Sequence, residues 1–119
     1  MRAIARAVLL EPLPLDEERR NRHLVYVAYF VRFLTDPALA KVVRDAPHAL
    51  ESLVAGLIAQ GQELGQVPRD LDPAAEAAFL VAAADGIQTT VLLEQRTPEE
   101  AVALIDHQLA RIFIAATGG

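Results

Sequence analysis

Apolar residues recur at helical spacing along most of the chain, and Val, Ile and Thr do not alternate with polar residues over a strand length. This pattern predicts an all-α domain of five to six helices. The expected helices span residues 2–10, 16–34, 37–44, 47–64, 73–94 and 97–116. The third and fourth count as two helices or as one helix kinked at Pro47.

Local sequence signals place the ends of several of these helices. Asp72-Pro73 combines an N-cap acceptor with a proline at the first helical position, where a missing N–H costs nothing. Thr97-Pro98 repeats the device, and Glu100 completes a capping box. Gly65 predicts a left-handed cap after the fourth helix.

The helix at 73–94 has two apolar faces. One face, expected to meet the core, carries Leu80, Ala84, Ile87 and Val91. The opposite face is built largely from small residues: Ala75, Ala78, Ala82, Gly86, Thr89 and Leu93. A helix needs one apolar stripe to pack on its own subunit, so the second stripe predicts another helix at close range.

The last helix has a similar division. Its expected core stripe is Val102, Ile105, Leu109, Ile112, Phe113 and Ala116. The opposite side mixes apolar and polar groups, as the rim of an interface does: Ala101, Leu104, Gln108, Arg111 and Ala115. We expect the two helices to pair with a second copy as a four-helix bundle, with Ala82, Gly86 and Thr89 near the two-fold axis. In the alternative, other helices of the same chain cover both faces.

The helix at 16–34 is the expected wall of a ligand pocket. Between residues 24 and 34 only Arg32 is charged, so this helix is expected to be buried on several sides. Tyr26, Phe30 and Phe33 share one stripe, with Tyr29 beside it. They form either a plain core face or a pocket lining.

The residues expected opposite this wall are Leu53, Leu57 and Ile87, with Leu50 and Gln60 on the same stripe as the two leucines. Such a pocket predicts a small hydrophobic or aromatic effector oriented by a tyrosine hydroxyl. We expect no fixed charge to face it, which argues against a strongly ionic effector, although aromatic rings can hold an organic cation.

Composition narrows the class of protein. The chain of 119 residues carries 11 basic and 16 acidic residues and a net charge of −5, whereas a DNA-contacting module needs a basic surface. Its densest basic cluster, Arg19, Arg20 and Arg22, is interleaved with acidic residues, as in a solvated helix start. No signal peptide is evident, and the longest uncharged stretch, 77–84, is too short to span a bilayer. We therefore expect a single soluble, cytoplasmic domain that contacts no membrane.

Candidate chemistry is sparse. The chain has no cysteine, and His23, His48 and His107 lack the i, i+4 spacing of a helical metal site. Ser52, the single serine, has no nucleophile-elbow context. Asp85, which precedes Gly86 within a helix, is interpreted as a structural or pocket-edge group. We expect no enzymatic activity, no catalytic residue, no metal and no cofactor.

Several motifs occur in an order that resembles one known family. They are DPAAEAA at 72–78, ADGIQ at 84–88, TPEEA at 97–101 and HQLARIF at 107–113, preceded by LPLDEERR at 13–20 and LTDPAL at 34–39. Together they resemble the C-terminal domain of TetR-family transcriptional regulators, in the subgroup with a BetI-like C-terminal domain. The resemblance spans residues 2–116. It implies a homodimer through the last two helices and a small effector bound between the helices.

The resemblance also implies a domain division. Residues 1–11 resemble the end of the helix that leads from a helix-turn-helix domain, and residues 12–117 the effector-binding and dimerisation domain. Residues 1–119 contain no helix-turn-helix pattern, so we expect contact with DNA only through an N-terminal domain outside them. The alternative is an interaction module that forms mixed dimers with a full-length regulator. A small all-α enzyme is a third hypothesis.

Overall fold

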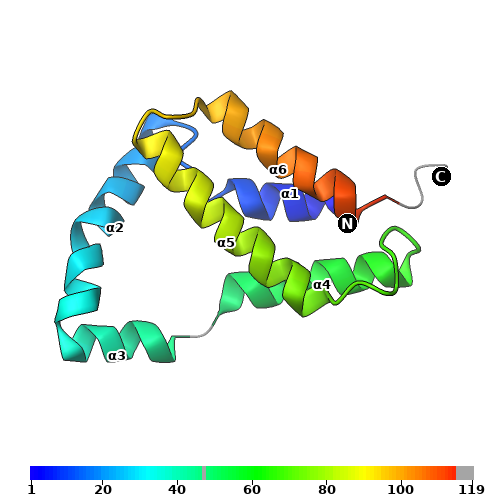
Figure 1. Cartoon of the computed structure of the whole chain (residues 1–119), viewed down its shortest axis with the longest axis horizontal. Coiled ribbons are helices and arrows are strands. Elements are labelled where there is room, and N and C mark those ends of the chain that lie inside the picture. The colour runs from blue at the N-terminus through cyan, green and yellow to red at the C-terminus, as the bar shows by residue number, and fades with distance from the viewer. Residues whose placement is uncertain (47, 115–119) are drawn as a thin grey trace.

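The computed structural model describes residues 1–46 and 48–114, which form six α-helices and no strand. The helices are α1 (Arg2–Leu10), α2 (Glu17–Thr35), α3 (Pro37–Asp45), α4 (Ala49–Glu63), α5 (Pro73–Leu92) and α6 (Pro98–Ile112) (Figure 1). The all-α prediction is confirmed, and the predicted helix ends differ from the observed ones by a few residues at most. Pro47, Ala115 and Ala116, to which the sequence patterns assigned roles, lie outside the described residues.

The predicted capping devices are present. The Asp72 carboxylate accepts a hydrogen bond from the backbone N–H of Ala74 at the start of α5. Thr97 and Glu100 form the capping box of α6, each side chain accepting from the other residue's backbone N–H. Gly65 has φ +74°, the left-handed conformation that glycine adopts without steric cost.

The core lies between α1, α4, α5 and α6, which pack on one another (Figure 1). Its fully buried large side chains come from all four helices and the loop after α1: Leu9, Leu13, Val54, Ile58, Leu80, Ile105, Leu109 and Ile112. Gln62 fixes the α4–α5 loop by donating hydrogen bonds to the carbonyls of Pro68 and Leu71. This loop returns the chain so that α5 packs along α4.

The helices α2 and α3, here called the α2–α3 arm, stand apart from this core (Figure 1). Neither helix contains a buried residue, and α2 packs mainly against α3. The expectation that α2 is buried on several sides is therefore wrong for this subunit alone. The helix is apolar nearly all round, but only its first turns lie close to the core.

The projecting arm makes the molecule open. The radius of gyration is 15.8 Å, whereas a compact domain of this length has about 13.5 Å. Ten large apolar side chains of the arm stay exposed: Leu24, Val25, Tyr26, Val27, Tyr29, Phe30, Val31, Leu34, Val42 and Val43. A large apolar surface thus remains uncovered within one subunit.

On α6 two adjacent predicted positions are misassigned. Ala101, expected on the outer face, is fully buried, and Val102, expected in the core, is only half-buried. One residue along a helix is a rotation of about 100°, and the i, i+4 spacing of Ala101, Ile105 and Leu109 places Ala101 on the buried stripe and Val102 to its side.

Among the described helices, α5 is long and apolar enough, by length and composition, to cross a membrane. Its most apolar 18-residue stretch has a mean hydropathy of 1.2, and 22% of that stretch is buried. Helices of soluble proteins pass the same criteria. In α5, Asp85 stands within the apolar stretch, where a charged side chain in a bilayer costs about 3 kcal/mol.

Candidate functional site

A groove of about 1090 Å³ separates the base of the α2–α3 arm from the core. Its walls come from the end of α1, the middle of α2, the start of α4 and the second half of α5. The lining residues are Val8, Glu11, Pro12, Arg22, His23, Leu24, Tyr26, Val27, Phe30, Leu50, Leu53, Asp85, Gln88, Thr89, Leu92 and Leu93. The volume slightly exceeds the usual range for small-molecule sites, about 300–1,000 Å³.

Three of the seven predicted ligand-binding residues line this groove: Tyr26, Phe30 and Leu53. Tyr29 is half-exposed elsewhere on α2, and Phe33 contacts Tyr26 with ring centroids 5.9 Å apart. The other two lie elsewhere: Leu57 belongs to the buried core and Ile87 packs against it. Gln60, on the same predicted stripe, is exposed.

The inner end of the groove is polar, which the sequence patterns did not indicate. Gln88 Nε2 donates a hydrogen bond to His23 Nδ1, joining α2 to α5. Glu11, Arg22 and Asp85 line the same end, so the expectation that no fixed charge faces the site is wrong. His23 lies three residues before Tyr26 and seven before Phe30, on the same helical face. Extending the aromatic stripe backwards by one turn would have found it.

The groove shifts the pKa values of two of these groups. Desolvation lowers the pKa of His23, as does the nearby Arg22 guanidinium, against the opposing effect of Asp85. Desolvation raises the pKa of the Asp85 carboxyl, against the opposing effect of His23. Both shifts favour the neutral form, as expected where apolar walls restrict water.

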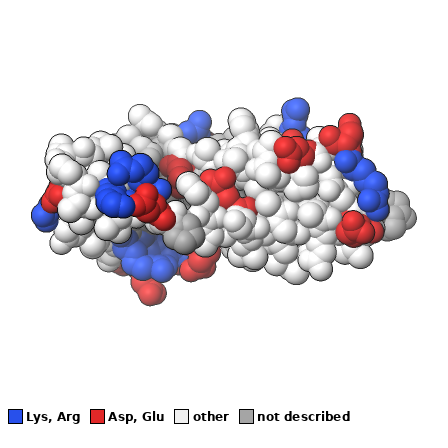
Figure 2. Space-filling view, turned by 90° about the horizontal axis from the view of Figure 1, so that it is seen from below, with Lys and Arg blue, Asp and Glu red and all other residues white. Residues whose placement is uncertain are grey.

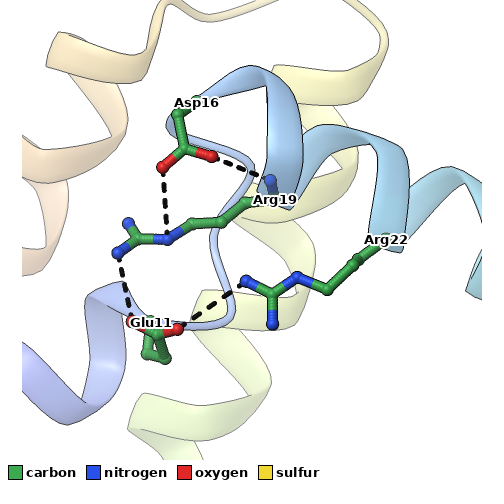
Figure 3. A network of polar contacts seen from close by, with 4 residues as sticks. All are labelled: Glu11, Asp16, Arg19 and Arg22. Atoms are coloured by element: carbon green, nitrogen blue, oxygen red, sulfur yellow. Dashed lines mark hydrogen bonds and ion pairs between the residues drawn. The ribbon is translucent and has the colours of Figure 1, made fainter.

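The end of α1 is tied to α2 by a small ionic network (Figure 3). Glu11 accepts a hydrogen bond from Arg19 at 3.1 Å and pairs with Arg22 at 3.7 Å. Asp16, the N-cap of α2, accepts from the backbone N–H of Arg19 and pairs with its guanidinium. Two of the three clustered arginines are thus engaged by carboxylates.

The small-residue face of α5 is uncovered. Its members Ala75, Ala78, Ala82, Gly86, Thr89 and Leu93 are all exposed. A Cβ atom built on Gly86 would meet no atom within 4 Å. The alternative in which other helices of the same subunit cover this face is therefore wrong for the described residues.

Three of the five residues predicted on the outer side of the last helix are at least partly accessible. Leu104 is 38% exposed, Gln108 is half-buried and Arg111 is exposed. The face of α5 and these α6 positions, here called the α5–α6 face, belong to neighbouring helices. The middle of α6 is anchored to α1, because Arg6 donates two hydrogen bonds to Asp106, at 2.7 and 3.3 Å.

Comparison with known families decides the assignment of this domain. The family model described as the C-terminal domain of BetI-type transcriptional repressors, a TetR-type C-terminal domain, matches residues 1–114. The chain belongs to this TetR family. Neither the curated proteins nor the solved structures gave a match.

The surface charges of this TetR-family domain are mixed in sign. On the face drawn in Figure 2, basic side chains stand next to acidic ones and form no continuous basic patch. The net charge of −5 agrees with this distribution. Family membership assigns the chain to transcription regulation through its C-terminal domain.

Proposed function

We propose that this chain is the ligand-sensing and dimerisation domain of a TetR-like transcriptional repressor, with the groove as its effector site. The observation that carries the proposal is the groove itself, which has aromatic and aliphatic walls and a polar inner end. Small-molecule sites have this composition, since apolar walls supply affinity and a few polar groups fix orientation. The domain works in the cytoplasm, without catalysis, metal or cofactor.

The effector we propose is a small compound with a hydrophobic or aromatic body. Its body would lie against Tyr26 and Phe30, with Leu53 on the opposite wall. A hydrogen-bonding group would reach the polar end, where the Gln88 amide and the Asp85 carboxyl line the groove. The Asp85 carboxylate accepts hydrogen bonds, and the Gln88 amide both donates and accepts.

Signal transfer would run from α2 to α1. The groove would be open when α2 stands away from α5 and closed when α2 moves towards it. An effector that binds the closed form more tightly raises the population of that form, and the shift is set by the difference in affinity between the two forms. Glu11 would carry this movement to the end of α1 through its contacts with Arg19 and Arg22. In relatives with a helix-turn-helix domain, the helix that resembles α1 leads to that domain. We propose no DNA contact by residues 1–119.

Thermal-shift screening of small aromatic and aliphatic compounds tests the effector site. A hit should stabilise the parent protein, and Tyr26→Ala should abolish the shift. Tyr29→Ala is the matched control, because Tyr29 is equally exposed on the same helix, 50% against 52%, but does not line the groove. Full stabilisation of Tyr26→Ala would move the site elsewhere.

The second candidate function is an interaction module that forms mixed dimers with a full-length regulator. The exposed small-residue face of α5 favours it as well as it favours a homodimer. The two functions differ in their dependence on a ligand. An interaction module would pair through the α5–α6 face while no compound stabilises it through the groove.

A further inference from the structure

The groove does not enclose a ligand within one subunit. Its lining side chains Tyr26, Phe30 and Leu53 are 52%, 47% and 50% exposed, and Leu93 is 63% exposed. Small-molecule sites generally bury roughly 70–90% of their ligand. With the arm in the described position, the groove needs a further surface to close its open side.

The open side adjoins the α5–α6 face. Thr89 and Leu93 belong to both, since they line the groove and also end the small-residue stripe of α5. A partner that packs on this stripe therefore also contacts the rim of the groove. No other helix of the described subunit covers this rim.

The uncovered area fits a second copy of the chain. The accessible surface is 7463 Å², about 1,100 Å² more than a compact monomer of this mass exposes. Stable dimers bury roughly 800 Å² per partner, and obligate ones more. Covering the stripe together with the groove rim would return the surface to the usual range.

We infer that a second copy of this chain closes the groove, so that each effector site is composite. This inference rests on the proposed function. A two-fold axis crossing α5 near Gly86 sets residues before the axis opposite residues after it. The partner's first half of α5, which presents exposed alanines and the exposed Phe79, therefore lies over Thr89 and Leu93. Phe79 lies seven residues before Gly86 and Leu93 seven after it, so the phenyl ring of the partner's Phe79 would pack on the protruding leucine at the groove rim.

The natural tyrosines provide a direct test. The chain has no tryptophan and two tyrosines, both on α2. In Tyr29→Phe, the fluorescence comes from Tyr26 in the groove. In Tyr26→Phe, it comes from Tyr29, which does not line the groove. Acrylamide quenching is measured on both variants while dilution takes the protein from dimer to monomer, as followed by analytical ultracentrifugation.

The quenching constant of the Tyr26 reporter should fall by about half or more on dimerisation, because interface contacts exclude water. The Tyr29 reporter should remain unchanged. A dimer in which Tyr26 is quenched as readily as in the monomer would refute the composite groove but leave the dimer intact. Protection of Tyr26 already in the monomer would mean that the arm closes the groove itself, which overturns the inference. Equal protection of both tyrosines in the dimer would mean that the partner covers the whole arm, which also overturns it. A monomer at every concentration would refute the dimer as well.

Discussion

Two helical glycines of α4, five residues apart, have opposite surroundings. A Cβ on Gly61 would lie 2.8 Å from Val67 Cγ2 and 3.0 Å from Phe113 Cε1, and both of these side chains are buried. A Cβ on Gly56 would meet nothing within 4 Å. Gly61 is thus required by the close approach of the loop after α4 and the end of α6, whereas Gly56 has no such role.

Alanine at these two positions should change the stability in opposite directions. Gly56→Ala should raise the free energy of unfolding by about 0.5–1 kcal/mol, because alanine favours the helix. Gly61→Ala should lower it by about 1 kcal/mol or more, since the cost of overpacking exceeds the helical gain. Urea denaturation at a fixed protein concentration measures both. Equal stabilisation by the two substitutions would mean that Val67 and Phe113 do not pack against α4 as described.

The charges around His23 predict two opposite pKa changes. Arg22 lowers the pKa of His23 and Asp85 raises it. Arg22→Gln should therefore move the pKa up towards the ordinary value, about 6.5, and Asp85→Asn should move it further down. NMR titration of the His23 ring measures both variants, and His107 on α6 serves as the internal control. A shift of the same sign in the two variants would contradict the geometry of the groove's polar end.

The lowered pKa also gives a pH dependence of stability. Because the unfolded chain binds a proton at His23 more readily than the folded chain, the His23 contribution destabilises the fold as pH falls below about 6.5. The raised pKa of Asp85 acts in a different window. Its ionisation penalty is absent below the ordinary pKa of about 3.8 and grows as pH rises through the folded value.

At the residue scale, the features that the sequence predicted correctly depend on residues close to one another along the chain. The conformation of Gly65 and the caps at Asp72 and Thr97 follow from local backbone chemistry, and all three are present. The pair of His23 and Gln88 joins residues 65 apart, and no local pattern encodes such a distance. The charged end of the groove was missed for the same reason.

At the scale of elements, the same Asp-Pro N-cap begins one helix of the arm and one helix of the core. Asp36-Pro37 starts α3 in the arm and Asp72-Pro73 starts α5 in the core, and each aspartate accepts from a backbone N–H of the first turn. The two helices differ in burial: α5 holds four buried residues, and α3 holds none. A cap on a core helix is coupled to global unfolding, whereas a cap on a separate arm is coupled only to local opening.

Removing the two caps should therefore have unequal effects. Asp72→Ala should lower the global free energy of unfolding by about 1 kcal/mol. Asp36→Ala should leave it nearly unchanged and instead speed amide hydrogen exchange within α3. Urea denaturation and hydrogen exchange give the two readouts. An equal loss of global stability would show that the arm folds cooperatively with the core.

The burial of whole elements was predicted less well than their ends. The composition of α2 indicated burial on several sides, because an apolar helix must lie in a core or against a partner. Composition gives the amount of surface to be covered but does not name what covers it. In one subunit α2 has no buried residue, so its apolar side chains become buried only if another surface packs on the arm.

At the scale of the whole molecule, two exposed apolar surfaces meet at one rim. The groove and the α5–α6 face share Thr89 and Leu93, so effector binding and subunit pairing would use neighbouring surfaces of the same helix. The sequence predicted the second surface from the spacing of small residues on α5. The position of the groove was predicted only in part, because it depends on the angle between the arm and the core.

The dimer itself is tested at the helical glycine where the two copies would approach most closely. Gly86→Leu should disrupt the dimer, because a branched side chain would hold the facing backbones apart, while the monomer keeps its fold since the added atoms meet nothing within 4 Å of the Cβ position. Gly56→Leu is the matched control: it is an exposed helical glycine with equally open space, but it lies on α4, away from the α5–α6 face. Sedimentation at micromolar concentration should give a dimer for the parent protein and the control and a monomer for Gly86→Leu. A dimeric Gly86→Leu would place the interface on another surface, for which the exposed α2–α3 arm would be the first to test.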